Sequence, residues 1–167
     1  MDDPQMTWET WVVSLDDASR ATAKSLRTQF EALGADDPAG WARSEISENI
    51  PHLARFVLLQ SLWRGAIDGW DRPGALEQVP AAQRLIAAGV DRADLARLAR
   101  AVAYEAVFAV LDELDEGRAV NASGVDVGWL VMESGEDGSP TGRMLSGLHE
   151  DLLTLDPSGR GGGDLEE

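Results

Sequence analysis

The chain has 167 residues, of which 44% are hydrophobic and 26% charged, and its formal net charge at pH 7 is −16. This length and composition are typical of one globular domain and not of an intrinsically disordered protein. The absence of cysteine excludes disulfide bonds, zinc–thiolate sites and a thiol nucleophile. Residues 1–4 are acidic where a secretory signal is basic, and no apolar run approaches the ~18 residues of a membrane span. We therefore expect a cytoplasmic protein.

The negative charge is concentrated in the last third of the chain. Residues 112–167 hold 14 acidic side chains against three arginines, whereas residues 1–111 hold 16 acids and 11 bases. A surface of one sign repels nucleic acid and anionic membranes and attracts basic proteins. The distribution predicts a basic protein partner and no direct contact with nucleic acid or membrane.

Helical spacing dominates the first half of the chain. Apolar residues recur three and four positions apart over residues 8–33, with a possible second helix start at Asp16 or Asp17 and a stop at Gly34. Asp37 followed by Pro38 combines a capping side chain with a first-turn proline and predicts a short helix.

A central helix is expected over roughly residues 50–70, after a start signal formed by Asn49 and Pro51. Apolar residues cover most of its circumference, and its narrow polar row consists of Gln60, Arg64 and Asp68. Helices of this kind pack against neighbours on several sides.

The longest predicted helix begins at a capping Asp91 and ends before Gly117, after a short helix between Pro80 and Gly89. Its apolar positions fit the helical template throughout.

Glu105 is the only charged residue between positions 101 and 111 of this helix, which predicts burial of that half nearly all round. A buried carboxylate has a raised pKa unless it is paired. The favoured interpretation is a structural ion pair with Arg64 or Arg55, so that Glu105→Ala would lower thermal stability. Exposure at a helix boundary is the alternative.

The chain changes character after residue 117. Val127–Glu133 is rich in β-branched and aromatic residues and predicts a strand, joined by turn residues to a second strand around Arg143–Leu145. Leucines at 148, 152 and 155 suit a short helix. Residues 158–167 are rich in glycine and acids and predict a flexible tail.

Together these elements predict a mainly α fold. We expect a single-domain helical bundle of four to six helices with a small C-terminal β-hairpin and a short last helix. Residues 1–117 would form the bundle, residues 118–157 the hairpin and last helix, and residues 158–167 the acidic tail.

Four acids form two pairs at i,i+3 spacing, Glu45 with Glu48 and Asp68 with Asp71. Residues at this spacing share a helix face, and carboxylate oxygens are ligands of Mg²⁺. The pattern resembles the acid pairs of the all-α NTP pyrophosphohydrolases, where metal-bound carboxylates help orient water at a nucleotide. The resemblance implies a Mg-dependent nucleotide pyrophosphohydrolase as an alternative function. Two solvated helix faces are the opposing interpretation.

No other pattern predicts catalysis. His52 and His149 are far apart in sequence and lie on different predicted elements, and no G-x-S-x-G motif is present. We predict no catalytic residue, metal or cofactor for the leading interpretation.

Trp129 shares one face of the predicted strand with Val127 and Val131, beside the acidic region. A tryptophan surrounded by acids suits an interface anchor with a charged rim. Packing of the hairpin on the helices explains the position of Trp129 equally well and is the favoured interpretation.

The leading hypothesis is a small acidic binding protein, such as an inhibitor, an immunity or antitoxin-like protein, or an adaptor, for a basic partner. Four of its acids crowd the C-terminal end of the long helix, where the helix dipole disfavours negative charge. The candidate partner-binding residues lie at that helix end and in the hairpin region after it: Asp112, Glu113, Asp115, Glu116, Trp129, Glu133, Glu136 and Asp137.

Overall fold

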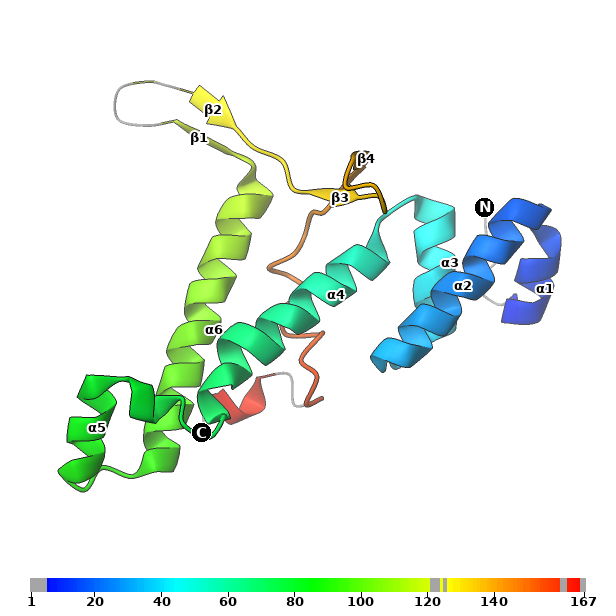
Figure 1. Ribbon diagram of the computed structural model, residues 1–167. Helices are drawn as coiled ribbons and strands as arrows, with labels where there is room; N and C mark the ends of the chain where they lie inside the picture. Colours follow the sequence, from blue (N-terminus) through cyan, green and yellow to red (C-terminus); the bar gives the residue numbers. More distant parts are fainter. Residues whose placement is uncertain (1–5, 121–123, 125, 160–161, 166–167) are drawn as a thin grey trace. The chain divides into compact units, whose positions relative to one another are not determined.

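The protein is mainly helical, as the sequence predicts. Figure 1 shows the computed structural model, which describes residues 6–120, 124, 126–159 and 162–165. Contacts divide the chain into two compact units, Met1–Val57 with Met132–Leu145, and Leu58–Val131 with Ser146–Glu167. The expectation of one domain over residues 1–157 stays a prediction.

The first unit contains three complete helices, the start of a fourth and a β-hairpin. In chain order these are α1 (Trp8–Ser14), α2 (Asp17–Leu33), α3 (Pro38–Glu48), the first turns of α4 (His52–Leu62), β3 (Met132–Ser134) and β4 (Pro140–Met144).

Side-chain caps set the helix boundaries of this unit. The carboxylate of Asp16 accepts hydrogen bonds from two backbone N–H groups at the start of α2, and Asp37 accepts one at the start of α3. Gly34 ends α2 with a φ of 81°, a conformation that glycine adopts without strain. These three predicted boundaries are confirmed. Asn49, which the sequence placed at the start of the next helix, instead ends α3 with a φ of 57°.

Aromatic side chains form much of the core of the first unit. Phe30 is fully buried, and its ring centroid lies 6.0 Å from that of Trp41 and 5.6 Å from that of Phe56. Trp11 is buried with small residues of α1 and α2. Burial of such large rings removes much apolar surface from water, so these contacts between α2, α3 and α4 are the main stabilising term of this unit.

The second unit contains the end of α4 and the elements that follow it. These are the π-helix η1 (Trp63–Ile67), the 3₁₀-helices η2 (Asp68–Asp71) and η3 (Leu76–Gln78), α5 (Pro80–Ala87), α6 (Arg92–Glu116), β1 (Arg118–Val120), β2 (Asp126–Gly128) and the 3₁₀-helix η4 (Gly163–Leu165). The predicted helix over residues 50–70 is therefore regular only as far as Leu62. Asp91 and Gly117 bound α6 as predicted.

The predicted strand Val127–Glu133 consists of two separate strands. β2 pairs with β1 in the second unit, and β3 pairs with β4 in the first. Trp129 lies between them, and its backbone N–H donates to the carbonyl of Gly117 at 2.9 Å. Trp129 therefore belongs to neither strand: the chain has left the β1–β2 ladder at this residue and has not yet entered the β3–β4 ladder.

Trp63 joins the C-terminal segment to the rest of the second unit. Its buried indole N–H donates to the carbonyl of Leu152 at 2.6 Å, and Leu148 and Leu152 are fully buried. The leucine spacing thus predicted the apolar contact correctly. Residues 148–155 form consecutive turns and not a regular helix, because their backbone hydrogen bonds alternate between i,i+3 and i,i+4 partners.

Part of the predicted acidic tail over residues 158–167 lies outside the described residues, namely 160–161 and 166–167. The backbone N–H of Gly162 donates to the Asp156 carboxylate at 3.1 Å. None of the helices in the described part of the chain combines the length and the apolar character needed to cross a membrane.

One face of α6 is exposed, which contradicts the predicted burial of residues 101–111. Glu105 is exposed, and Val102 and Val110 retain 60% and 59% of their accessible surface. Within its unit α6 packs against η1, η2 and η4, which contact its other side. Glu105 is thus exposed in the middle of α6, and neither the predicted burial nor a position at a helix boundary is observed.

We therefore expect Glu105→Ala to change the free energy of unfolding by less than about 0.5 kcal/mol. Leu111→Ala, on the buried side of the same helix, should cost about 2–5 kcal/mol. Urea denaturation of the two variants measures both values. A loss for Glu105→Ala as large as that for Leu111→Ala would contradict the exposed position of Glu105.

Candidate functional site

Three exposed acids mark the C-terminal end of α6 in the second unit: Asp112, Glu113 and Glu116. The fourth predicted acid, Asp115, has a different environment, since only 8% of its side chain is exposed. Its Oδ2 lies 3.0 Å from the backbone nitrogen of His149 and 2.7 Å from the imidazole Nδ1 of the same residue. Asp115 therefore holds the C-terminal segment on α6, while the other three acids face solvent.

The hydrogen bond that the His149 imidazole donates to Asp115 raises the pKa of His149. Burial opposes this shift, and the charges of Asp115, Asp112 and Glu150 add to it. The His149 ring also packs edge-on against Phe108 at a centroid distance of 5.6 Å. Sequence reasoning missed this pair, because the two partners are separated by 34 positions.

Trp129 packs on the end of α6. Its indole N–H donates to the carbonyl of Glu113 at 3.0 Å, one of the last carbonyls of the helix, which lack intrahelical partners. This contact fits the packing interpretation of Trp129, which the sequence favours over the interface anchor. Its role as an interface anchor stays a prediction.

The remaining candidate acids belong to the β3–β4 hairpin of the first unit. Glu133 binds Arg143 through two hydrogen bonds of 2.8 and 2.5 Å, and these lower the pKa of Glu133. Hydrogen bonds from Ser139 lower the pKa of Asp137 at the turn, and Glu136 is exposed. The hairpin acids belong to the first unit and the acids at the end of α6 to the second.

Glu45 and Glu48 occupy unlike environments although they are one turn apart. The side chain of Glu45 is 3% exposed, and its two oxygens accept hydrogen bonds from Arg143 at 3.0 Å and from the backbone N–H of Leu53 at 2.8 Å. Glu48 is exposed and accepts a hydrogen bond from Ser44. Beside Glu45 lies a cavity of about 400 Å³ whose other lining residues are Thr22, Leu26, Ile46, Asn49, Leu53, Glu133 and Arg143.

Asp68 and Asp71 bind an arginine in the second unit. Arg100, whose side chain is 6% exposed, lies 2.7 Å from Asp68 and 3.2 Å from Asp71. Its guanidinium supplies the positive charge that a metal ion would otherwise bring to these carboxylates. Sequence reasoning missed Arg100, although a charged residue on the buried side of α6 is a signal that could have indicated the pair.

Neither acid pair gains support as a metal site. The two pairs belong to different units, and no group of three or more potential ligands with metal-binding geometry occurs among residues 6–120, 124, 126–159 and 162–165. The two histidines likewise belong to different units. His52 is buried, and its Nε2 lies 2.9 Å from the hydroxyl of Ser44.

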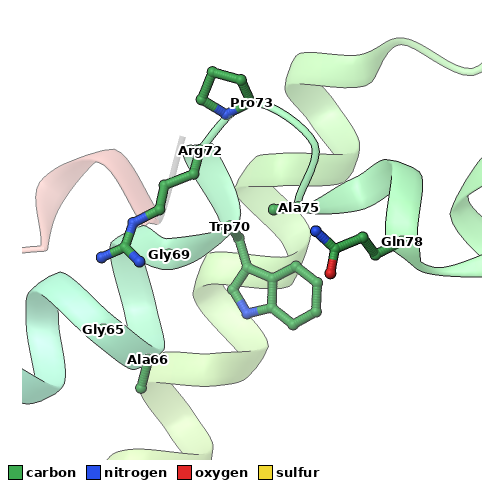
Figure 2. A pocket seen from close by; sticks show the side chains of 8 residues that line it. All are labelled: Gly65, Ala66, Gly69, Trp70, Arg72, Pro73, Ala75 and Gln78. Atoms are coloured by element: carbon green, nitrogen blue, oxygen red, sulfur yellow. The ribbon is translucent and has the colours of Figure 1, made fainter.

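A second cavity of about 400 Å³ is lined by residues of η1, of η2 and of the segment after them (Figure 2). Two glycines and two alanines belong to its lining, together with the indole of Trp70 and the side-chain amide of Gln78. Figure 2 shows the guanidinium of Arg72 pointing away from the indole, and Arg72 donates a hydrogen bond of 2.5 Å to the carbonyl of Arg64. The cavity therefore brings no set of charged groups together for catalysis.

The third cavity is entirely apolar. It has a volume of about 330 Å³ and lies within the second unit between the end of α4 and the second half of α6. Its lining residues are Leu58, Leu62, Ala106, Val107, Val110, Leu111 and Leu114. We call this cavity the α6 groove.

Comparisons of the chain with protein-family models, with curated proteins and with solved structures found no match in any of the three. The proposed function therefore rests on the side chains and surfaces described above.

Removal of the Glu45 carboxylate should destabilise the first unit. Glu45→Ala leaves the Leu53 N–H without its acceptor and removes one of the two carboxylates that bind Arg143, so we expect a loss of about 3 kcal/mol in the free energy of unfolding. Glu48→Ala is the matched control in the same helix and should change this free energy by less than about 0.5 kcal/mol. Denaturant titration of both variants tests the difference, and equal losses would argue against burial of Glu45.

The His149–Asp115 contact should make stability depend on pH. A folded-state pKa above the ordinary 6.5 means that the contact stabilises the fold fully below pH 6.5 and that this contribution disappears as the pH rises through the folded-state pKa. NMR titration should show a lower His149 pKa in Asp115→Asn than in the wild type. Asp94→Asn, at the other end of α6, should leave that pKa unchanged, and an unchanged value in Asp115→Asn would refute the contact.

Proposed function

We propose that this protein is a small cytoplasmic binding protein that engages a basic protein partner through the acidic end of α6. The observation that carries the proposal is the exposure of Asp112, Glu113 and Glu116 at a helix terminus whose dipole disfavours acids. The next base along the chain, Arg118, is bound to Asp126. The stability of α6 does not explain why acids occupy these positions, which favours a role of the acids in binding another molecule.

The charge of the whole chain supports the same function. With a net charge of −16, the protein repels nucleic acid and anionic membranes over distances of about 10 Å at moderate salt and attracts basic proteins. Complementary charge accelerates association and makes it sensitive to ionic strength. An inhibitor, an immunity or antitoxin-like protein and an adaptor all use charge in this way.

The hydrolase alternative has no supporting observation. Arg100 binds both Asp68 and Asp71, and Glu45 binds Arg143, so three of its four proposed metal ligands already pair with guanidinium groups.

Capture with matched charge variants tests the proposal. The immobilised wild type should retain a basic protein at about 0.05 M salt and release it at about 0.5 M, where charges are screened within a few ångströms. Glu113→Gln with Glu116→Gln should weaken retention at least fivefold. Glu9→Gln with Asp36→Asn removes the same charge from exposed positions of the first unit and should leave retention unchanged. Equal retention by both double variants would refute the α6 acids as the binding surface.

A further inference from the structure

The exposed face of α6 carries a continuous apolar row. Leu98, Val102, Ala106 and Val110 recur every four residues, so they are neighbours along one side of the helix. Leu98, Val102 and Val110 expose 61%, 60% and 59% of their surface, and Ala106 is also exposed. Contiguous apolar surface of this kind is typical of interaction sites, whereas single exposed apolar residues are common everywhere.

The row leads into the α6 groove. Ala106 and Val110 belong to both, and Leu58 and Leu62 of α4 form the opposite wall. All lining side chains are apolar, so the groove offers no hydrogen bond to a polar ligand. Its chemistry therefore favours apolar side chains of another chain.

Acids border the same row. Glu105, Asp112 and Glu116 are seven and four residues apart, which places them along one flank of the helix, and Glu113 stands one turn after Val110. All four are exposed. From Leu98 to Val110 the row spans twelve residues, or about 18 Å at a rise of 1.5 Å per residue.

We propose that this face of α6 docks an amphipathic basic helix of the protein partner. Apolar side chains of that helix would fill the α6 groove, and its lysine or arginine side chains would meet the flanking acids, as in other helix-in-groove complexes. The inference rests on the proposed function and names the segment of the partner that the site binds.

A second copy of this chain fits the face less well. Two copies would bring together two molecules of charge −16 and two faces that both carry the exposed acids Glu105 and Glu113. Like charges placed opposite each other across an interface oppose association. The charge that attracts a basic helix therefore disfavours self-association.

A model helix provides a direct test. The probe is a fluorescein-labelled peptide of about 14 leucine and lysine residues with the leucines on one helical face, long enough to span the apolar row. Its control has the same composition in scrambled order. Fluorescence anisotropy should show binding of the patterned peptide and at least tenfold weaker binding of the scrambled one.

Substitutions that leave the net charge unchanged separate the contribution of the α6 groove to peptide binding from that of the acids. Val110→Ser removes apolar surface and Ala106→Gln fills the groove, and each should weaken binding of the patterned peptide about fivefold or more. Val13→Ser makes the same change at an exposed valine of α1 and should leave binding unchanged. Equal binding by Val110→Ser, Ala106→Gln and Val13→Ser would overturn the inference, as would a wild-type dimer that Ala106→Gln converts to a monomer in sedimentation analysis.

The two proposals fail in different ways. A captured basic protein that Glu113→Gln with Glu116→Gln loses, but that Val110→Ser and Ala106→Gln both retain, would overturn the inference and leave the proposed function standing. Absence of any captured basic protein, with the model peptide still sensitive to Val110→Ser and Ala106→Gln, would overturn the proposed function.

Discussion

The shortage of positive charge is the constraint on which the rest of this structure depends. Fourteen lysine and arginine side chains stand against thirty acids, so most carboxylates cannot have a cation of their own and have to share one or remain without one. Two of the least exposed arginines each bind two acids: Arg100 joins the 3₁₀-helix after α4 to α6, and Arg143 joins the hairpin to α3. In both cases one guanidinium lies between two carboxylates. It lowers the repulsion between these carboxylates and connects the elements that carry them.

The same shortage determines the character of the surface that remains. The acids at the end of α6 follow the exposed apolar row that ends at Val110, so charge and apolar area occur together on one helix. Charge speeds the encounter with a partner and gives it orientation, while the apolar row supplies contact area that ionic strength does not weaken. A partner that offered only one of the two would bind less well.

Local signals in the sequence predicted the helix boundaries, because a cap such as Asp16, Asp37 or Asp91 acts on backbone groups within three residues. The same reasoning failed for pairings over long distances. The contact of Asp115 with His149 and that of Glu45 with Arg143 join positions separated by 34 and 98 residues. It also failed at Glu105. The apolar neighbours of Glu105 in the sequence predicted that this half of α6 is buried all round, but α6 packs against other elements on one side only. The acids of the candidate site were visible as a charge run, but only the structure separates the engaged Asp115 from its exposed neighbours.

The π-helix between Trp63 and Ile67 changes how the sequence of this region has to be interpreted. A regular helix turns by about 100° per residue, so one additional residue in a turn rotates everything that follows by that angle. Asp68, which follows the π-helix, therefore leaves the polar row that the spacing of Gln60, Arg64 and Asp68 suggests, whereas Arg64 still donates a hydrogen bond of 2.9 Å to Gln60. Gln60 is buried, Arg64 is exposed, and Asp68 meets Arg100. The wide turn thus shifts the helical phase between α4 and the 3₁₀-helix η2, and Asp68 meets Arg100 after that shift.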